Sequence, residues 1–599
     1  MNLRLGRVVP ALLVLLALAL LAWASTHGLL PALAVVLAAG LGWWARAPGA
    51  PAPGALSGVR DVSREALASV ANMAMHLAPR RLWHAAGMEA EGSPHVWTPE
   101  RLRDTLHRHL EGERLVLCAN REPYIHERTP DGGVLVRHPA SGLVTALEPV
   151  MRACSGTWVA HGGGSADAQT VDEHDRLRVP PGEESYVLRR VWLTPEEEQG
   201  YYYGFANEGL WPLCHIAHTA PTFRAEDWRQ YSGVNRRFAE AVCDEADRPD
   251  AIVLVQDYHF ALVPRHVRER MPEATVLSFW HIPWPNAERF AICPWSRELL
   301  EGMLGASIIG FHTPQHVNNF LESVDRCLEA RVDRDDSAVI LRGHRTQVRS
   351  YPISIEWPHR GASAAPPAAE CRARVVADLH LAPDTLIGVG VDRVDYTKGL
   401  EERFLAVEKL LESAPRFAGR FVFVQLGAPS RTAIPAYRDL NARLEQEAAR
   451  INERFATPQW KPIHLLREHH EPEAVMLYCR AAALCYVSSL HDGMNLVAKE
   501  FVAARDDEQG VLVLSQFTGA ARELREALVV NPYDVEQAAA TLGRALDMSP
   551  DEQRQRMASM RAHLSEFNVY RWAGRLIEDA ARLRRQNRSG ARTPTGVPA

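Results

Sequence analysis

The chain has 599 residues, of which 47% are hydrophobic and 23% charged, and its formal net charge is −6 at pH 7. It is long enough for two or three globular domains with large buried cores. Its charge provides no basic field for a polyanion, so we expect no nucleic acid partner. The nine cysteines are scattered, without a C-x-x-C pair or a zinc-like Cys/His cluster, which predicts buried thiols in a reducing compartment.

The N-terminus carries two uncharged apolar runs, residues 8–24 and 29–45. Each run has about 17 residues, the short end of what spans a bilayer. Arg4 and Arg7 precede the first run and Arg46 follows the second, so the positive-inside rule places both outer ends in the cytoplasm. We therefore predict a transmembrane helical hairpin over residues 1–46.

Two other interpretations of this segment stay open. Ala22-Trp23-Ala24, which precedes Ser25, resembles a signal-peptidase site, so the first run is also compatible with a cleaved signal. A buried hairpin in the core of a domain is the third option. The immediate start of the second run favours the transmembrane hairpin.

Composition and periodicity divide the rest of the chain. Residues 47–111 begin rich in Pro, Gly and Ala and continue polar, which predicts a linker and short helices. The predicted strands then lie at 115–119, 251–255, 275–279, 307–311, 347–353, 386–391, 421–426, 464–466, 484–487 and 511–514. The predicted helices lie at 234–246, 263–271, 316–327, 401–412, 433–453, 472–480, 496–504 and 534–547.

Strands that alternate with helices predict a parallel sheet covered by helices, here in two sets. A Pro/Ala-rich passage at 361–369 separates the sets, so we expect two Rossmann-like domains, 112–360 and 361–583. The fold class is α/β, with the two domains facing each other across a cleft and ligands at the carboxyl ends of the strands. Residues 584–599 predict a disordered tail.

Two dense motifs fall at such strand ends. Residues 390–399 read Gly-Val-Asp-Arg-Val-Asp-Tyr-Thr-Lys-Gly, and residues 491–500 read His-Asp-Gly-Met-Asn-Leu-Val-Ala-Lys-Glu. Arg393 and Lys398 carry cations that can neutralise a diphosphate, and the later Asp and Glu can hold hydroxyls. The combination indicates a sugar nucleotide.

Lysine usage supports this interpretation. Of the 67 Lys and Arg residues, lysine occurs only at positions 398, 409, 461 and 499. Two of the four lie in the motifs above, and an ammonium meets phosphate oxygens from many angles. Lys398 and Lys499 are therefore either ligand-binding cations or remnants of ordinary composition.

Five passages together resemble the trehalose-6-phosphate synthase family of retaining glycosyltransferases, over roughly residues 115–580. They are Val-Gln-Asp-Tyr-His at 255–259, His-Ile-Pro-Trp-Pro at 281–285, residues 392–399, residues 492–500, and Val-Val-Asn-Pro-Tyr-Asp at 529–534. The resemblance implies the GT-B architecture of two Rossmann-like domains. It also implies a UDP-forming enzyme that makes trehalose 6-phosphate from UDP-glucose and glucose 6-phosphate.

The same resemblance assigns roles on the donor side. Arg393 and Lys398 resemble the diphosphate clamp, and Asp492 resembles the ligand of the glucose hydroxyls. Glu500 resembles the ligand of the ribose hydroxyls. His281 resembles the group near the reacting carbon. The further donor-binding positions implied are Gly142, in Ser-Gly-Leu at 141–143, and Gly493, Met494, Asn495 and Leu496.

On the acceptor side, Arg121 and Arg431 resemble the cations that receive the phosphate. Tyr202 and Trp211 resemble the acceptor-side aromatic residues. Asp257 resembles a hydroxyl ligand, with a helix N-cap as the structural alternative. The catalytic set implied is thus Arg393, Lys398, His281 and Asp257.

The implied mechanism is transfer on one face of the sugar, in which a leaving-phosphate oxygen takes the proton of the acceptor hydroxyl. No metal and no cofactor are expected, because Arg393 and Lys398 supply the positive charge. The expected location is the inner membrane, with the catalytic domains facing the cytoplasm. Whether the chain forms a homo-oligomer stays open.

Two passages depart from the family pattern. Where the family has Trp-x-Gly-Trp-x-Gly, this chain has Trp-Val-Ala-His-Gly-Gly-Gly at 158–164, and residues 120–124 read Asn-Arg-Glu-Pro-Tyr. Another phosphorylated acceptor, such as glycerol 3-phosphate, or another nucleotide-glucose therefore stays open. A catalytically silent membrane-tethered sensor and a pyridoxal-phosphate-dependent phosphorylase are the alternatives from other classes.

Overall fold

The computed structural model of the chain describes residues 96–110, 114–139 and 142–590. The hairpin predicted at 1–46 lies outside the described residues, as does most of the predicted linker. Within the described ranges, no helix is both long and apolar enough to cross a membrane.

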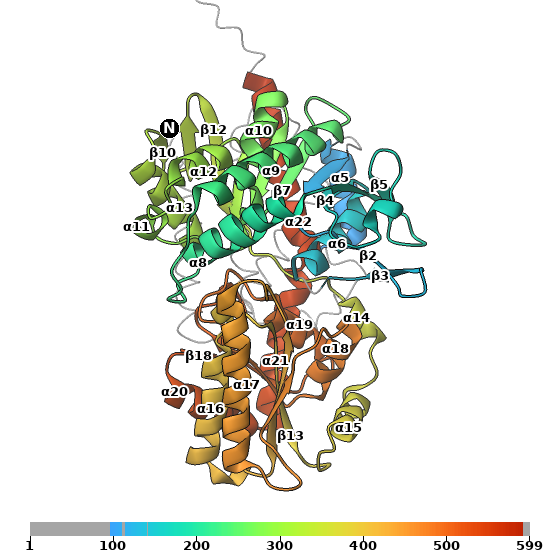
Figure 1. Cartoon of the computed structure of the whole chain (residues 1–599), viewed down its shortest axis with the longest axis vertical. Coiled ribbons are helices and arrows are strands. Elements are labelled where there is room, and N and C mark those ends of the chain that lie inside the picture. Colours follow the sequence, from blue (N-terminus) through green and yellow to red (C-terminus); the bar gives the residue numbers. More distant parts are fainter. Residues whose placement is uncertain (1–95, 111–113, 140–141, 591–599) are drawn as a thin grey trace, which may run out of the picture. The chain divides into compact units, whose positions relative to one another are not determined.

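The described residues form two α/β halves. In Figure 1 the first is drawn mainly in blue to yellow-green and the second mainly in yellow to orange, and the red C-terminal helix returns to the first. The N-terminal half carries β1 to β12 and the C-terminal half carries β13 to β18. The strands of the N-terminal half are β1 (Leu115–Cys118), β2 (Ile125–Arg128), β3 (Val134–Arg137), β4 (Thr157–His161), β5 (Arg176–Val179), β6 (Tyr186–Val191), β7 (Ile252–Gln256), β8 (Thr275–Phe279), β9 (Ile308–Phe311), β10 (Arg331–Asp333), β11 (Ala338–Leu341) and β12 (His344–Ser350). Those of the C-terminal half are β13 (Leu386–Arg393), β14 (Phe421–Ala428), β15 (Ile463–Leu466), β16 (Leu484–Val487), β17 (Val511–Ser515) and β18 (Leu528–Val530).

The C-terminal sheet has the order β15-β14-β13-β16-β17-β18, and every pair is parallel. This is the order of a doubly wound dinucleotide-binding sheet, in which the connections reverse direction between β13 and β16. On one face lie α16 (Leu400–Ser413), α17 (Pro435–Phe455) and α20 (Val535–Leu546). On the other lie α15 (Ala368–Asp378), α18 (Pro472–Ala481) and α19 (Leu496–Ala504).

The N-terminal sheet has ten strands in the order β10-β11-β12-β9-β8-β7-β1-β4-β6-β5. From β12 to β6 the pairs are parallel, and the antiparallel β5, β10 and β11 extend the two edges. Its connections reverse between β1 and β7. The helices and helical segments are α5 (Pro99–Leu110), α6 (Gly142–Cys154), α7 (Pro195–Glu198), the π-helical η2 (Gln199–Leu210), α8 (Trp211–Cys214), α9 (Ala225–Asp244), α10 (Val263–Arg270), α11 (Ala287–Phe290), α12 (Ser296–Met303) and α13 (Pro314–Cys327).

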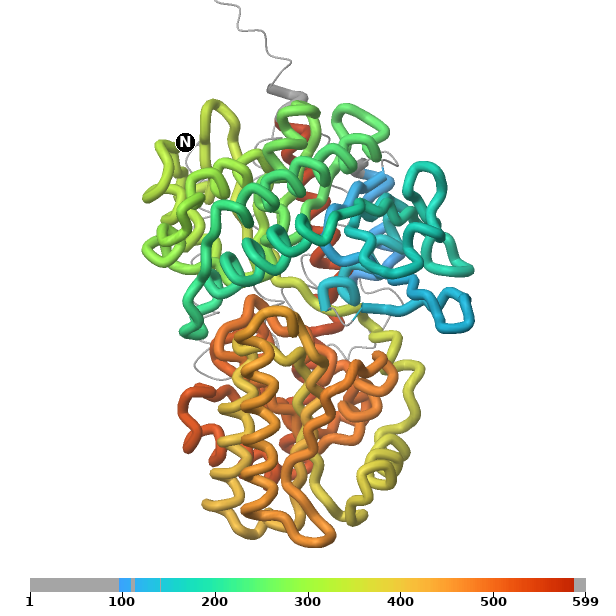
Figure 2. Tube along the Cα trace, in the orientation of Figure 1, coloured from blue at the N-terminus to red at the C-terminus, as the bar shows by residue number. Residues whose placement is uncertain are grey.

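The chain crosses between the halves twice. It enters the C-terminal half after β12, and it returns between α21 (Pro550–Glu566) and α22 (Val569–Gly590). The two crossings are joined, because the Val569 N–H donates to the Ile355 carbonyl at 2.9 Å. Helix α22 then packs against α5 and α6, so that the red end of the tube lies among the blue and green segments in Figure 2.

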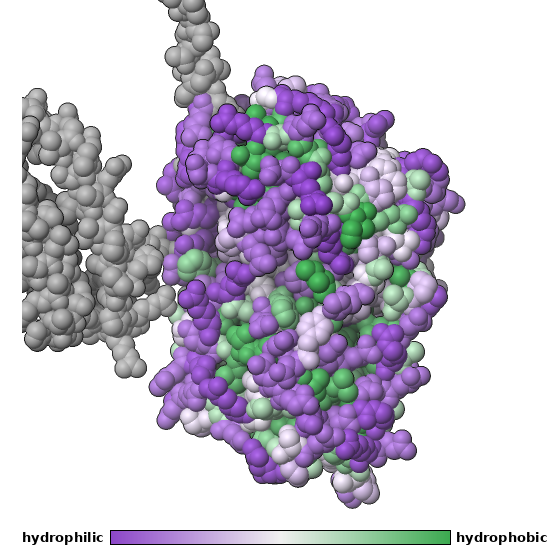
Figure 3. All heavy atoms as spheres, turned by 90° about the vertical axis from the view of Figure 1, so that its left-hand side faces the viewer, coloured by the Kyte–Doolittle hydropathy of each residue, from purple (hydrophilic) through white to green (hydrophobic). Residues whose placement is uncertain are grey.

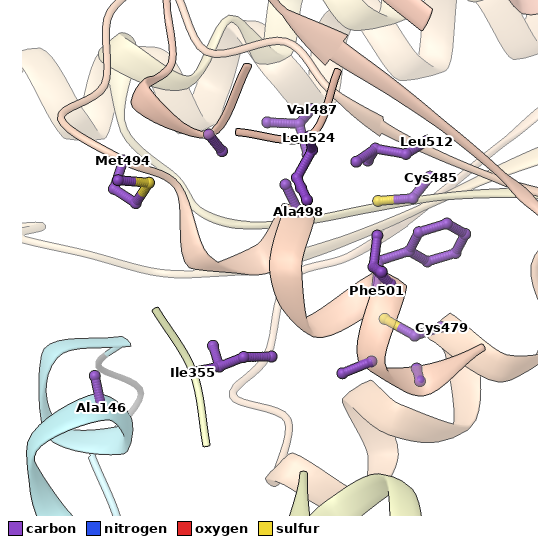
Figure 4. Close-up of a cluster of buried hydrophobic side chains, with 14 of the residues drawn as sticks. Ala146, Ile355, Cys479, Cys485, Val487, Met494, Ala498, Phe501, Leu512 and Leu524 are labelled. Carbon is purple, nitrogen blue, oxygen red and sulfur yellow. The ribbon is translucent and has the colours of Figure 1, made fainter. Parts of the chain in front are cut away.

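Apolar side chains on both sheets fill the interior. Figure 4 shows α19 against the C-terminal sheet, with Phe501 beside Cys485 and Cys479 and with Ala498 near Val487. Figure 3 shows the outside of one face, where hydrophilic side chains predominate and apolar ones gather in patches between them. The core therefore holds α19, and the motif at its N-terminus, firmly against the sheet.

The structure confirms the α/β class and the two sets of parallel strands. Three elements have the predicted bounds, namely β8, β16 and α19. Strand β12 ends at Ser350 instead of residue 353, because Pro352 has no N–H to continue the ladder. Helix α22 continues to Gly590, past Arg584, where we expected the tail to begin.

Candidate active site

A cavity of about 410 Å³ lies where the reversal points of the two sheets meet. Loops after β1 and β7 form one wall, and loops after β13 and β16 form the other. Of the predicted site residues, all except Gly493 line this cavity, namely Arg121, Gly142, Tyr202, Trp211, Asp257, His281, Arg393, Lys398, Arg431, Asp492, Met494, Asn495, Leu496 and Glu500.

The wall formed by the loops after β13 and β16 is called the donor wall here, after the predicted roles of its residues. On this wall the two motifs meet directly. The Lys398 Nζ donates to Asp492 Oδ2 at 2.5 Å. Lys398 ends a short 3₁₀ turn that Asp395 caps, and Gly399 follows in the left-handed region with φ of 61°. A Cβ at Gly399 would lie 2.3 Å from the Ser488 carbonyl oxygen, so only glycine fits there.

The Lys398–Asp492 pair is largely but not fully buried, and the pairing shifts the pKa of the acid. Burial alone would raise the pKa of Asp492, but the Lys398 ammonium outweighs it and lowers the pKa to about 2. Asp492 also accepts from Ser489 Oγ and Asn495 Nδ2, both at 3.2 Å. The pair therefore stays charged at neutral pH and directs the ammonium toward the cavity.

The N-terminus of α19 faces the same cavity. The Asn495 side chain caps it by accepting the Ala498 N–H at 3.0 Å, and Asn495 itself has φ of 79°. Among the described residues, the N–H groups of Leu496 and Val497 have no acceptor. Free N–H groups at the positive end of a helix dipole, next to Lys398, suit an anionic ligand such as a diphosphate.

Gly493 does not line the cavity, but it joins the two halves. A Cβ there would lie 2.1 Å from the His281 carbonyl oxygen. The loop of residues 491–495 therefore touches the loop that follows β8, which only a glycine at this position permits. On the other side, Gly142 begins α6 and lies close to Leu496.

Glu500, on α19, lines the same cavity. Burial raises its pKa to about 7, and its carboxyl has no hydrogen-bond partner among the described residues. His359, His470, Met476 and Cys479 also line the cavity, and burial together with the charge of the nearby Glu500 raises the pKa of the Cys479 thiol. An unpaired carboxyl beside an apolar, histidine-lined recess suits a ribose hydroxyl pair and a flat base.

Lys499 differs from Lys398. It is fully buried, its Nζ donates to the Ile353 carbonyl at 2.7 Å and it is paired with Glu523. It lines no part of the cavity, so the interpretation as a ligand-binding cation is wrong for this lysine. It joins α19 to the segment that crosses between the halves.

Asp257 and His281 lie at the ends of β7 and β8. Asp257 has φ of 71°, a strained value for a non-glycine residue, and its Oδ1 accepts the His281 N–H at 3.0 Å. Its side chain makes no capping bond to the following turn, so the N-cap alternative is wrong. Burial raises the pKa of Asp257 to about 7. His281 Nε2 lies 2.6 Å from Gln256 Oε1, which orients the ring.

The opposite side of the cavity, which we call the acceptor wall after the predicted roles of its residues, holds cations among aromatic rings and includes Arg431 from the loop after β14. Arg121 donates to the Tyr202 hydroxyl at 3.1 Å, and Arg431 donates to the Tyr258 hydroxyl at 3.2 Å. The Arg431 guanidinium lies 4.3 Å from the centre of the Trp211 ring. Burial would raise the pKa of Tyr202, but the charges of Arg121 and Arg431 lower it to about 7. Arg431 is also paired with the buried Asp395 at 3.2 Å, and Arg121 adds a second cation, so this wall is suited to a phosphate.

The comparison with known proteins decides the family. The family model of glycosyltransferase family 20 matches residues 113–582. This chain belongs to glycosyltransferase family 20.

The matches to individual relatives cover almost the whole length of each relative. The trehalose-6-phosphate synthase of Mycobacterium sp. (strain KMS) is 38% identical over 476 residues, which are 78% of this chain and 95% of the relative. The E. coli structure described as trehalose-6-phosphate bound with UDP-2-fluoro glucose aligns with a TM-score of 0.69 at 32% identity, over 78% of this chain and 99% of that one. An α,α-trehalose-phosphate synthase (UDP-forming) of Burkholderia xenovorans aligns with a TM-score of 0.68 at 31% identity, over 78% and 100% of the two chains.

Sequence reasoning missed several residues at this family 20 site. Tyr258, His359 and His470 line the cavity, and Arg403 lies behind it, where its Nη2 donates to Asp392 Oδ2 at 2.7 Å. Tyr258 lies in the motif Val-Gln-Asp-Tyr-His at 255–259, directly after the predicted site residue Asp257. The two histidines come from loops without a motif, so only the fold brings them to the cavity.

Proposed function

We propose that this chain is a retaining glucosyltransferase that forms trehalose 6-phosphate from UDP-glucose and glucose 6-phosphate. The observation that carries the proposal is a single cavity with a diphosphate-type site on one wall and a phosphate-type site on the other. Lys398 and the N-terminus of α19 form the first, and Arg121 and Arg431 form the second.

The relatives support the choice of substrates. The E. coli structure is bound with UDP-2-fluoro glucose, and the Burkholderia xenovorans structure is in complex with glucose-6-phosphate. In this chain the donor would place its diphosphate at Arg393 and Lys398 and its ribose at Glu500. The acceptor would place its phosphate between Arg121 and Arg431, with its sugar toward Asp257.

In the proposed mechanism, the bond between C1 of glucose and the UDP oxygen breaks while the acceptor hydroxyl bonds to C1 on the same face. The proton of that hydroxyl passes to the departing phosphate oxygen, so the reaction gives UDP and retains the configuration at C1. Arg393 and Lys398 would stabilise the charge that develops on UDP, which is usually the largest contribution in such a step. His281 and Asp257 would hold the two sugars in position.

The test is an assay of the purified full chain with each of UDP-, ADP- and GDP-glucose, offered together with glucose 6-phosphate or glycerol 3-phosphate. The proposal expects trehalose 6-phosphate and UDP from the first pair. Turnover only with another donor or acceptor would correct the substrate. Binding of both ligands without any product would instead support the silent sensor.

We also propose that the apolar runs at 8–24 and 29–45 anchor the enzyme in the inner membrane with its catalytic part in the cytoplasm. Arg4, Arg7 and Arg46 at their outer ends support this orientation. Full-length protein should sediment with membranes and resist extraction by salt, whereas a variant without residues 1–58 should not. Equal distribution of both proteins in the soluble fraction would contradict the anchor.

A further inference from the structure

The two passages that depart from the family pattern meet in a buried charged cluster behind the acceptor wall. Its members, which we call the Arg190 cluster, are Glu122, His126, Asp167 and Arg190. Arg190 and Asp167 are fully buried and Glu122 is almost so. The residues of the cluster do not line the cavity, and they have no role in the mechanism proposed above.

Every donor of Arg190 has a partner. Its Nε donates to Glu122 Oε2 at 2.9 Å, and its Nη2 lies 2.8 Å from Asp167 Oδ1. Nη2 also lies 2.8 Å from His126 Nδ1, and Nη1 donates to the Asp167 carbonyl at 2.9 Å. A buried guanidinium with this many partners fixes the groups around it, since any displacement leaves a charge unpaired.

The cluster binds the glycine passage rather than leaving it free for a ligand. The Gly163 N–H donates to Glu122 Oε1 at 3.1 Å, and the Gly164 N–H donates to Asp167 Oδ2 at 2.6 Å. A Cβ at Gly164 would lie 2.4 Å from the His126 carbonyl oxygen, so the passage is packed closely on the cluster.

Arg121 lies between two anchored neighbours. On one side, Asn120 Oδ1 accepts from the Tyr201 hydroxyl at 2.8 Å, and the Asn120 carbonyl accepts the His161 N–H at 3.3 Å. On the other side, Glu122 is held by Arg190 and Gly163. The backbone of Arg121 is therefore fixed, while its exposed side chain reaches the cavity and contacts Tyr202.

We propose that Glu122, held by Arg190, is a positioning residue that fixes Arg121 for the phosphate of the acceptor. The proposal rests on the proposed function, because it deepens the assignment of the acceptor site. Glu122 itself touches no substrate. It acts by holding the loop that carries Arg121, so its loss affects the phosphate and leaves the donor wall unchanged.

The variant Glu122→Ala removes both bonds of the carboxyl. We expect the KM for glucose 6-phosphate to rise about tenfold, because an arginine that must be ordered on binding contributes less affinity. The KM for UDP-glucose and the kcat at saturating acceptor should stay within about twofold and threefold of the parent. Glu122→Gln keeps only the bond to Gly163. Its KM for glucose 6-phosphate should therefore lie between those of the parent and of Glu122→Ala.

A double-mutant cycle separates this role from general support of the fold. In the Arg121→Ala background, Glu122→Ala should add almost nothing to the KM for glucose 6-phosphate, because the group that it positions is gone. A fully additive effect, or an equal rise in the KM for both substrates, would overturn the proposal. Glu240→Ala, at an exposed position on α9, is the control and should match the parent.

If Glu122→Ala does not fold, Glu122→Gln and its double mutant with Arg121→Ala give the same test. Calorimetric binding of glucose 6-phosphate to the full chain distinguishes this proposal from the proposed function. Wild-type protein that binds the sugar phosphate but makes no product would refute the function, and weaker binding by the Glu122 variants would still support positioning. Unchanged binding by the variants of an active enzyme would refute positioning alone.

Discussion

The donor wall and the acceptor wall of the cavity are built in different ways. Two short loops at adjacent strands, β13 and β16, supply the donor wall, and Lys398 and Asp492 join them by a direct ion pair. The acceptor wall draws Arg121, Tyr202 and Asp257 from three distant segments of the N-terminal half, and Arg431 from the C-terminal half. The donor chemistry therefore depends on local motifs, whereas the acceptor chemistry depends on the fold.

The difference has a physical cause. A diphosphate is bound by backbone N–H groups and a cation at one strand-to-helix turn, which a few consecutive residues can build. In the proposed complex, the acceptor's phosphate would be bound by long side chains, which need other groups packed behind them. Rings and buried charges supply that support, as when Trp211 lies under Arg431. Substitutions on the two walls should therefore have separable effects.

The largest effect is expected from Lys398→Ala. Removing the ammonium takes away charge stabilisation of the leaving UDP, so kcat should fall by about 10²–10³-fold. Steady-state rates at saturating substrates measure this. Lys409→Ala, at a partly exposed position on α16 that does not line the cavity, is the matched control and should keep full activity. An unchanged kcat in Lys398→Ala would remove the donor wall from the proposed mechanism.

The second effect separates the two lysines of the motifs. Lys499→Met leaves the largely buried Glu523 with only His563 beside it, at 3.8 Å, so the free energy of unfolding should fall by about 3–5 kcal/mol. Chemical denaturation measures this. Adding Glu523→Gln to the Lys499→Met variant should recover part of the lost free energy of unfolding. The folded fraction of Lys499→Met should catalyse the reaction at the normal rate. A stable but inactive variant would show that Lys499 acts on the ligand after all.

Glu500 should link donor binding to pH. Because burial raises its pKa to about 7, the carboxylate that would accept ribose hydroxyls is present above pH 7 and protonated below it. The KM for UDP-glucose should therefore rise as the pH falls below 7. In Glu500→Gln this dependence should be absent, with a KM about tenfold higher than the parent at pH 8. A pH dependence that persists in the variant would place it elsewhere.

The smallest effect concerns the acceptor wall. Tyr202→Phe removes the hydroxyl that contacts Arg121, so the KM for glucose 6-phosphate should rise by about threefold to tenfold at pH 6.5. Since the pKa of Tyr202 is lowered to about 7, its charge above that pH would repel the phosphate. The parent should lose acceptor affinity above pH 7, and the variant should not. A change in the KM for UDP-glucose of this variant would contradict the prediction that substitutions on the two walls have separable effects.

The sequence predicted the donor wall more fully than the acceptor wall. Two motifs and the family resemblance grouped Arg393, Lys398, Asp492 and Glu500, and the structure places these motifs after the neighbouring strands β13 and β16, with Glu500 on α19. Lysine usage alone did not separate Lys398 from Lys499, although the resemblance gave a role to Lys398 only, and the full burial of Lys499 explains the difference. The supports of the acceptor wall have no local pattern.

The Arg190 cluster illustrates this limit. Arg190 lies in a strand, β6, that the sequence did not predict, and its partner Glu122 is 68 positions away. The family resemblance identified residues 120–124 and 158–164 as departures from the family pattern. Only the fold explains them, because it brings the acid of one passage to the N–H of the other.

The most direct test of the central claim follows the glucose carbon itself. The full chain is mixed with UDP-glucose labelled with ¹³C at C1 of glucose and with unlabelled glucose 6-phosphate, and NMR spectra are recorded as the product forms. The proposed mechanism predicts a non-reducing phosphorylated disaccharide in which the labelled C1 is α-configured and bonded through oxygen to C1 of the acceptor. A β-configured or reducing product, or labelled free glucose alone, would contradict it.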